Sequence, residues 1–114
     1  MNKITFHQFK RIMSRQLLNK DKSMEIEFCV DNYTEYQESW LGKLVDKKTN
    51  KEVFWYGLTA DGTQAYNFDS LDSFMSAKVF RGKSIEEIWD LILILSLNGN
   101  TIEEIQGNFD ELWI

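Results

Sequence analysis

Residues 24–30 read MEIEFCV, and apolar side chains occupy every second position of this stretch. Met24, Ile26, Phe28 and Val30 share one side, while two glutamates and the chain's one cysteine occupy the positions between them. Successive side chains of a β-strand point to opposite faces of its sheet, so strict alternation indicates a strand that is buried on one side. The stretch therefore predicts a half-buried strand.

Three further strand-like stretches follow it. They are SWLGKLVD (39–46), EVFWYGLT (52–59) and TQAYNF (63–68). The last two are separated by Asp61-Gly62, a dipeptide that favours a hairpin turn. Four consecutive strands joined by short connections predict an antiparallel meander.

Helices are expected before and after this meander in the sequence. Thr5 followed by Gln8 forms a capping-box pattern and predicts a helix over about 6–19. This helix is amphipathic, with an apolar side and a basic side. After the meander, Ser70 can cap a short helix that ends near Ala77.

Two more capping-box patterns, Ser84 with Glu87 and Thr101 with Glu104, predict a helical C-terminal third. The apolar run at 91–97 allows two interpretations. The capping box and the 3.6-residue periodicity favour a helix, whereas a strand followed by an Asn98-Gly99 hairpin turn is the alternative. The predicted fold class is α+β: an N-terminal amphipathic helix, a four-stranded antiparallel meander and a helical C-terminal third.

Length and composition indicate one domain with a proper core. The chain has 114 residues, 43% of them hydrophobic and sixteen of them Phe, Trp or Tyr. Cys29 is the single cysteine, so no internal disulfide can form. The N-terminus lacks a signal-peptide pattern, and no apolar run approaches the length of a membrane span. A cytoplasmic protein without a membrane segment is expected.

Charge is distributed unevenly along the chain. Residues 1–24 carry six basic side chains and one acidic one, whereas residues 84–114 carry seven acidic side chains and no basic one. Acids in the first turn of a helix stabilise its dipole, and the basic helix could also neutralise the acidic end internally. The functional interpretation is that the acidic end binds a basic surface of another protein. The residues expected to make that contact are Glu86, Glu87, Asp90, Glu103 and Glu104.

A nucleic-acid-binding role is the second interpretation. Lys10, Arg11 and Arg15 lie on the basic side of the first predicted helix and could contact phosphates. The rest of the chain is strongly acidic and would repel nucleic acid outside a narrow footprint. Nucleic acid is therefore the less favoured partner.

The aromatic strand at 52–59 offers a third kind of surface. Phe54 and Tyr56 point to the side opposite Trp55, so both faces of the sheet carry rings. If helices cover only one face, the rings on the other face are typical anchors of a protein interface or of a homodimer. Phe54 and Tyr56 are the residues predicted for this role.

Catalytic chemistry is not expected. His7 has no second histidine as a metal-binding partner, and carboxylates near Cys29 would raise the pKa of its thiol. The adjacent pairs Glu86/Glu87 and Glu103/Glu104 diverge on a helix and do not form an acid and base. The sequence predicts a non-enzymatic protein with no catalytic residues, no metal site and no cofactor.

Several local features stand together within residues 53–90. They are the aromatic strand, the Asp61-Gly62 turn, Ala77-Lys78-Val79-Phe80, and Gly82-Lys83-Ser84 followed by Glu87-Ile88-Trp89. This third of the chain resembles small uncharacterised proteins of low-GC Gram-positive bacteria and their mobile elements. Acidic single-domain proteins of that kind are often inhibitors, including anti-CRISPR proteins that block an RNA-guided nuclease. The resemblance thus implies an inhibitor or modulator of a nucleic-acid-handling protein.

Overall fold

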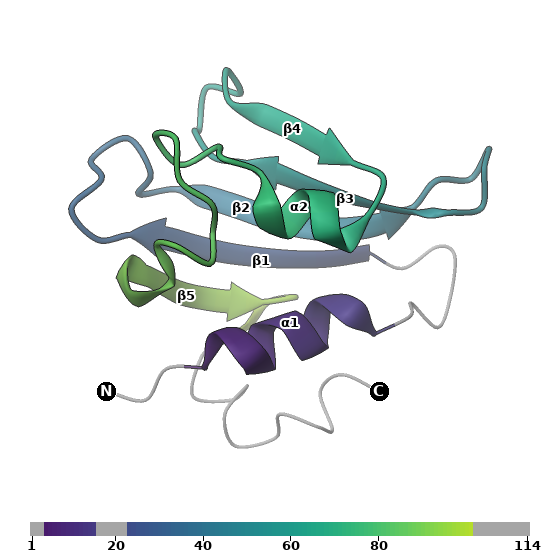
Figure 1. Cartoon of the computed structure of the whole chain (residues 1–114), viewed down its shortest axis with the longest axis horizontal. Helices are drawn as coiled ribbons and strands as arrows, with labels where there is room; N and C mark the ends of the chain where they lie inside the picture. Colours follow the sequence, from purple (N-terminus) through teal and green to yellow (C-terminus); the bar gives the residue numbers. More distant parts are fainter. Residues whose placement is uncertain (1–3, 16–22, 102–114) are drawn as a thin grey trace.

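The chain forms an antiparallel sheet with helices packed against it (Figure 1). The computed structural model describes residues 4–15 and 23–101. Its strand order is β4-β3-β2-β1-β5-β6, and every neighbouring pair is antiparallel. The elements are α1 (Phe6–Ser14), β1 (Ser23–Val30), β2 (Ser39–Val45), β3 (Glu52–Gly57), β4 (Ala65–Phe68), α2 (Leu71–Ser76), a 3-10 turn (Trp89–Leu91), β5 (Ile92–Leu97) and the two-residue β6 (Asn100–Thr101).

The capping box predicted at the first helix is present. The backbone N–H of Gln8 donates to the Thr5 hydroxyl oxygen at 3.0 Å, and the Thr5 N–H donates to the Gln8 side-chain oxygen at 2.8 Å. Phe9, Ile12 and Met13 are buried on the side of α1 that packs on the sheet. The helix ends at Ser14, and residues 16–19 of the predicted helix lie outside the described residues.

The meander is confirmed, and its first strand has the predicted alternation. The four apolar side chains of β1 are all buried, and the strands from β1 to β4 pair in chain order. On the same face, the Tyr56 ring stacks on the Phe74 ring of α2 at 4.2 Å between centroids. The Tyr56 hydroxyl donates to the Phe74 carbonyl at 2.9 Å, which satisfies the one polar atom of this buried ring.

The helical interpretation of residues 91–97 is wrong. The reciprocal hydrogen bonds between Ser84 and Glu87 form, but they open a turn at 85–88 and then the 3-10 turn. Residues 92–97 continue as β5, which pairs with the free edge of β1. Ile92, Ile94 and Leu97 complete the core on the helix side, and that burial explains why pairing outweighs the local helical pattern.

The helical C-terminal third is therefore contradicted over residues 92–101. Asn98 and Gly99 both adopt positive φ, at 49° and 86°, as a two-residue hairpin turn requires. They reverse the chain into β6, so the hairpin alternative is the observed structure. The third predicted capping box begins at Thr101 in β6, and its partner Glu104 lies outside the described residues.

A lysine inside the core ties α1 to the sheet. Lys43 of β2 has no exposed side-chain surface, and it lies on the helix side. Its ammonium donates to the Met13 carbonyl at 3.0 Å and to the Arg15 carbonyl, and it pairs with Glu52 at 3.1 Å. These carbonyls belong to the end of α1, where helical hydrogen bonds run out. Burial lowers the pKa of Lys43, and the Glu52 carboxylate opposes that shift.

Candidate functional site

The two faces of the sheet differ in cover. Both helices pack on one face, and the buried core of the described residues lies there (Figure 1). On the opposite face, Trp40 of β2 and Leu44 of the same strand are 37% and 40% exposed, and Leu95 of β5 is 43% exposed. No helix of the described part of the chain covers these side chains. We call this opposite side the open face.

Strand register brings aromatic rings and carboxylates together on the open face. In each of two neighbouring cross-strand rows, β1 supplies a glutamate, and β2 and β3 supply one tryptophan and one glycine between them. The rows are Glu25–Gly42–Trp55 and Glu27–Trp40–Gly57. The tryptophan changes strand from one row to the next, so the two indoles are diagonal neighbours.

The two glycines leave space above the sheet beside the Trp55 ring. A Cβ added to Gly42 would overlap the carbonyl oxygen of Met24 and would lie 2.9 Å from Cζ2 of Trp55, so the Trp55 indole covers Gly42 directly. At Gly57 the nearest such atom is Cζ3 of Trp55, 3.9 Å away. A larger side chain in either row would fill the space above the sheet.

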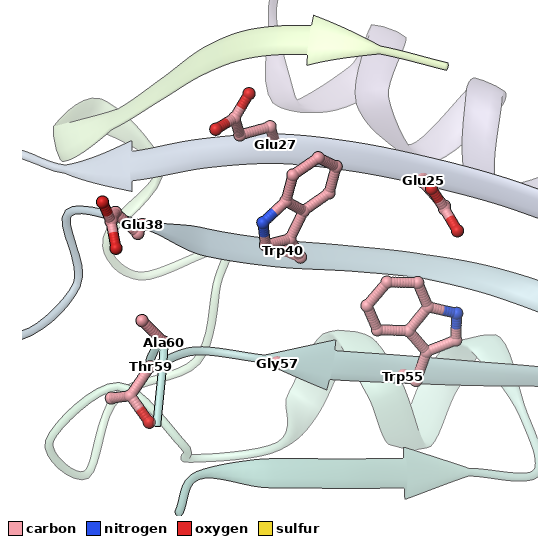
Figure 2. Close-up of a pocket in the computed structure, with 8 residues that line it drawn as sticks. All are labelled: Glu25, Glu27, Glu38, Trp40, Trp55, Gly57, Thr59 and Ala60. Atoms are coloured by element: carbon pink, nitrogen blue, oxygen red, sulfur yellow. The ribbon is translucent and has the colours of Figure 1, made fainter. Parts of the chain in front are cut away.

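A shallow groove of about 570 Å³ runs between these side chains (Figure 2). Glu38, in the connection before β2, adds a third carboxylate, and Thr59 and Ala60 close one end. Figure 2 shows Glu27 beside the Trp40 ring and Glu25 on the side of Trp55. Within the described residues, none of the three carboxylates pairs with a cationic side chain.

The groove has the chemistry of a cation site. The face of an indole attracts a positive charge through its quadrupole, and tryptophan is the strongest of the aromatic residues in this respect. A carboxylate beside the ring adds Coulomb attraction for the same cation and can accept its N–H hydrogen bonds. The two rows thus offer two indole–carboxylate pairs to an ammonium or guanidinium group.

The predicted acidic contact residues have different surroundings. Glu86 and Asp90 are exposed and line a second depression with Ile4, Thr5, Phe6 and Trp89, beside the first turn of α1. No acidic residue lies within that first turn, so these two carboxylates are placed to stabilise the α1 dipole from outside the helix. They do not share a helix face, because 85–88 is a turn. Glu103 and Glu104 lie outside the described residues.

Glu87 is held by the protein itself. Its carboxylate pairs with Lys78 and accepts the Ser84 backbone N–H at 2.9 Å. The Lys78 hydrogen bond, followed by the Ser84 N–H, lowers the pKa of Glu87 to about 2. A carboxylate bound in this way is less accessible to a partner than Glu86 or Asp90.

Removing the lysine should raise the pKa of Glu87. The folded-state pKa is below the ordinary 4.5, so this carboxylate stabilises the fold above that pH and its contribution is lost as the pH falls toward 2. We expect Lys78→Met to move the Glu87 pKa upward toward its ordinary value in a carbon-detected NMR titration. Lys83→Met, in the same connection, is the control and should leave it unchanged. An unshifted Glu87 in Lys78→Met would contradict the assignment.

The basic side of α1 is exposed, as the sequence predicts. Lys10 and Arg11 are exposed and Arg15 is half-buried, and both arginines interact with other parts of the protein. Their predicted contact with nucleic acid stays a prediction.

Phe54 and Tyr56 are wrongly assigned as contact residues. Both are buried on the helix side, where Phe54 packs against Phe74 at 5.8 Å between ring centroids. The ring that β3 presents to the open face is Trp55. The alternation predicts this separation, but it leaves open which side the helices cover.

Other candidate groups have structural surroundings. The pKa of the Cys29 thiol is raised, first by burial and then by the nearby Asp31 carboxylate, which disfavours the nucleophilic thiolate. His7 is exposed on α1. Over residues 4–15 and 23–101, no three His, Cys, Asp or Glu side chains come together as metal ligands, and no helix has the length and apolarity needed to span a membrane.

Comparison of the chain with protein families, with curated proteins and with solved structures finds no match.

The sequence alone did not predict the groove. Its signal was present in part, because the alternation puts Glu25, Glu27 and Trp55 on the polar side of their strands. The missing information was the register that places Trp40 beside them.

Proposed function

We propose that the protein binds a basic segment of a partner protein across the open face of its sheet and acts as a non-enzymatic inhibitor or modulator. The observation that supports this is the pair of indole–carboxylate rows, whose carboxylates have no cationic partner among the described residues. A net charge of −5 favours encounter with a basic partner at a distance.

The contacts within the groove are too weak on their own to hold a partner, so the interface must be larger than the groove. A cation on an exposed indole contributes about 0.5–1 kcal/mol, and an exposed ion pair contributes about 0.2–1 kcal/mol. Two rows together then give roughly 1.5–4 kcal/mol, whereas a micromolar complex needs about 8 kcal/mol. Exposed Leu44 and Leu95 beside the groove provide apolar area for the remainder.

A nucleic-acid-handling protein is the partner class that fits this surface. Such proteins bind phosphates through lysine and arginine, and RNA-guided nucleases hold their heteroduplex in a positively charged channel. An acidic face with aromatic anchors can compete for the same basic groups. Free nucleic acid would be repelled by Glu25, Glu27 and Glu38 at this face.

The test compares two acidic surfaces with the same probe. Fluorescein-labelled nona-arginine is titrated with wild type, with Glu25→Lys/Glu27→Lys and with Glu86→Lys/Asp90→Lys, and the Kd is measured by fluorescence anisotropy at low salt. Both double variants change the net charge equally. We expect the open-face variant to bind about tenfold more weakly, a loss of about 1.4 kcal/mol, and the control at most about twofold more weakly.

Two results would contradict the proposal. Equal losses in both variants would mean that the probe responds to net charge alone. A larger loss in Glu86→Lys/Asp90→Lys would assign binding to the acidic end that the sequence predicts. Circular dichroism of both variants checks that the fold is retained. Size-exclusion chromatography over a range of concentrations tests the homodimer prediction, because a homodimer would make the elution volume depend on protein concentration.

A further inference from the structure

We infer that the groove recognises two basic side chains at alternating positions of an extended segment, a pattern of the form Arg-x-Arg. This inference rests on the proposed function and specifies the ligand of that surface. It is carried by the spacing of the two rows, Glu25–Gly42–Trp55 and Glu27–Trp40–Gly57.

The spacing of the rows matches that of an extended peptide. Glu25 and Glu27 are two residues apart in β1, so the rows are separated by about 7 Å along the strand. Side chains at positions i and i+2 of an extended peptide lie on one side with the same separation of about 7 Å. A segment that runs along the strands can therefore place one cation in each row.

The shallow shape of the groove favours an extended segment over a helix. Gly57 lines the groove without a side chain, the Trp55 ring lies over Gly42, and the volume of the groove is about 570 Å³. A helix with its side chains is about 10 Å across and would rest on the rings without reaching the floor. An extended backbone can lie above the rings while its basic side chains enter the groove.

Arginine fits each row better than lysine. The guanidinium group is flat, so it can stack on an indole and direct its N–H groups to a neighbouring carboxylate. The ammonium of lysine is a compact, strongly hydrated charge that makes only part of this contact. Row two has Glu27 directly opposite Trp40, and row one has Glu25 with Trp55 lying over Gly42, so each row holds both partners.

The decisive experiment varies spacing at constant composition. Three acetylated and amidated pentapeptides, Ser-Arg-Ser-Arg-Ser, Ser-Arg-Arg-Ser-Ser and Ser-Arg-Ser-Ser-Arg, are titrated into the full chain, and each Kd is obtained by NMR at low salt. We expect the alternating peptide to bind about fivefold more tightly than the other two, since only it fills both rows while extended. The lysine version of the alternating peptide should bind more weakly than the arginine version.

A single-site variant tests the two-row arrangement itself. Glu25→Gln removes one carboxylate and keeps the size of the side chain, so the alternating peptide should lose most of its advantage over the other two. Glu86→Gln, outside the groove, should preserve that advantage. Equal affinities of the three peptides for wild type would overturn the inference.

The outcomes separate the inference from the proposed function. If spacing has no effect while Glu25→Lys/Glu27→Lys still weakens nona-arginine binding, the spacing rule fails and the proposed function stands. If neither probe senses the open face, both fail. Cellopentaose serves as a neutral probe that stacks on indoles. If it bound at Trp40 and Trp55 more tightly than the alternating arginine peptide, the groove would be a sugar site and the inference would be overturned.

Discussion

Gly42→Ala is expected to lower the free energy of unfolding by about 3 kcal/mol or more. The added methyl group would overlap the Met24 carbonyl oxygen, and it would press on the Trp55 ring at 2.9 Å. The carbonyl belongs to the backbone of β1, so β1 and β2 must move apart to accommodate the methyl group. That movement disturbs the central strand pair of the sheet and the floor of the groove together. Urea denaturation followed by circular dichroism measures the loss.

Gly57→Ala provides a matched control in the same groove. Its added methyl group would lie 3.9 Å from the Trp55 ring, which is ordinary van der Waals contact. We expect a change in stability within about 0.5 kcal/mol. If the two alanine variants were equally stable, the close approach of β1 to Gly42 would be wrong, and so would the position of Trp55 above it.

Lys43→Met is expected to destabilise the fold by about 3 kcal/mol. Methionine keeps the length of the side chain but removes the ammonium donor from the Met13 and Arg15 carbonyls and the ion pair with Lys43 from the Glu52 carboxylate. Replacing a buried ion pair by apolar residues is often tolerated, but removing only one member is not. Because two of the lost bonds cap the end of α1, amide hydrogen exchange in that helix should also become faster.

Glu52→Gln separates the two roles of Lys43. Glu52 is partly exposed, and glutamine can still accept a hydrogen bond, so we expect a loss of about 1 kcal/mol. A Lys43→Met variant as stable as wild type would show that the ammonium does not hold the end of α1. A larger loss in Glu52→Gln than in Lys43→Met would assign the energy to the ion pair alone.

Much of the fold could be predicted because local patterns and tertiary packing agree. The alternation over 24–30 and the capping box of Thr5 with Gln8 each specify one structure, and both are present. The helix prediction for residues 91–97 was wrong because their local preference and their tertiary pairing disagree. Their periodicity suits a helix, but β1 has a free edge and the core lacks side chains on that side. That requirement depends on a strand more than sixty residues away, so a local stretch of sequence does not show it.

The candidate site was less predictable for a related reason. Alternation within β3 separates Trp55 from Phe54 and Tyr56, but only the packing of Phe74 of α2 on Phe54 and Tyr56 decides which side is covered. The neighbours of Trp40 depend on inter-strand register, which hairpin turns of unequal length do not reveal. The charge asymmetry along the chain predicts a site at the acidic end, whereas the groove combines two carboxylates of β1 with rings from β2 and β3.

A basic segment bound to the open face would lie beside the Trp40 and Trp55 indoles, so the indole N–H signals of the full chain report directly on this binding. In a two-dimensional ¹H–¹⁵N NMR titration with nona-arginine, we expect the Trp40 and Trp55 signals to shift and the Trp89 signal to stay. Trp89 is the reference because it lines the depression beside Glu86 and Asp90, and its indole N–H donates to the Ile4 carbonyl at 3.2 Å. A shift of the Trp89 signal with the Trp40 and Trp55 signals unmoved would contradict binding at the open face and assign it to the acidic end.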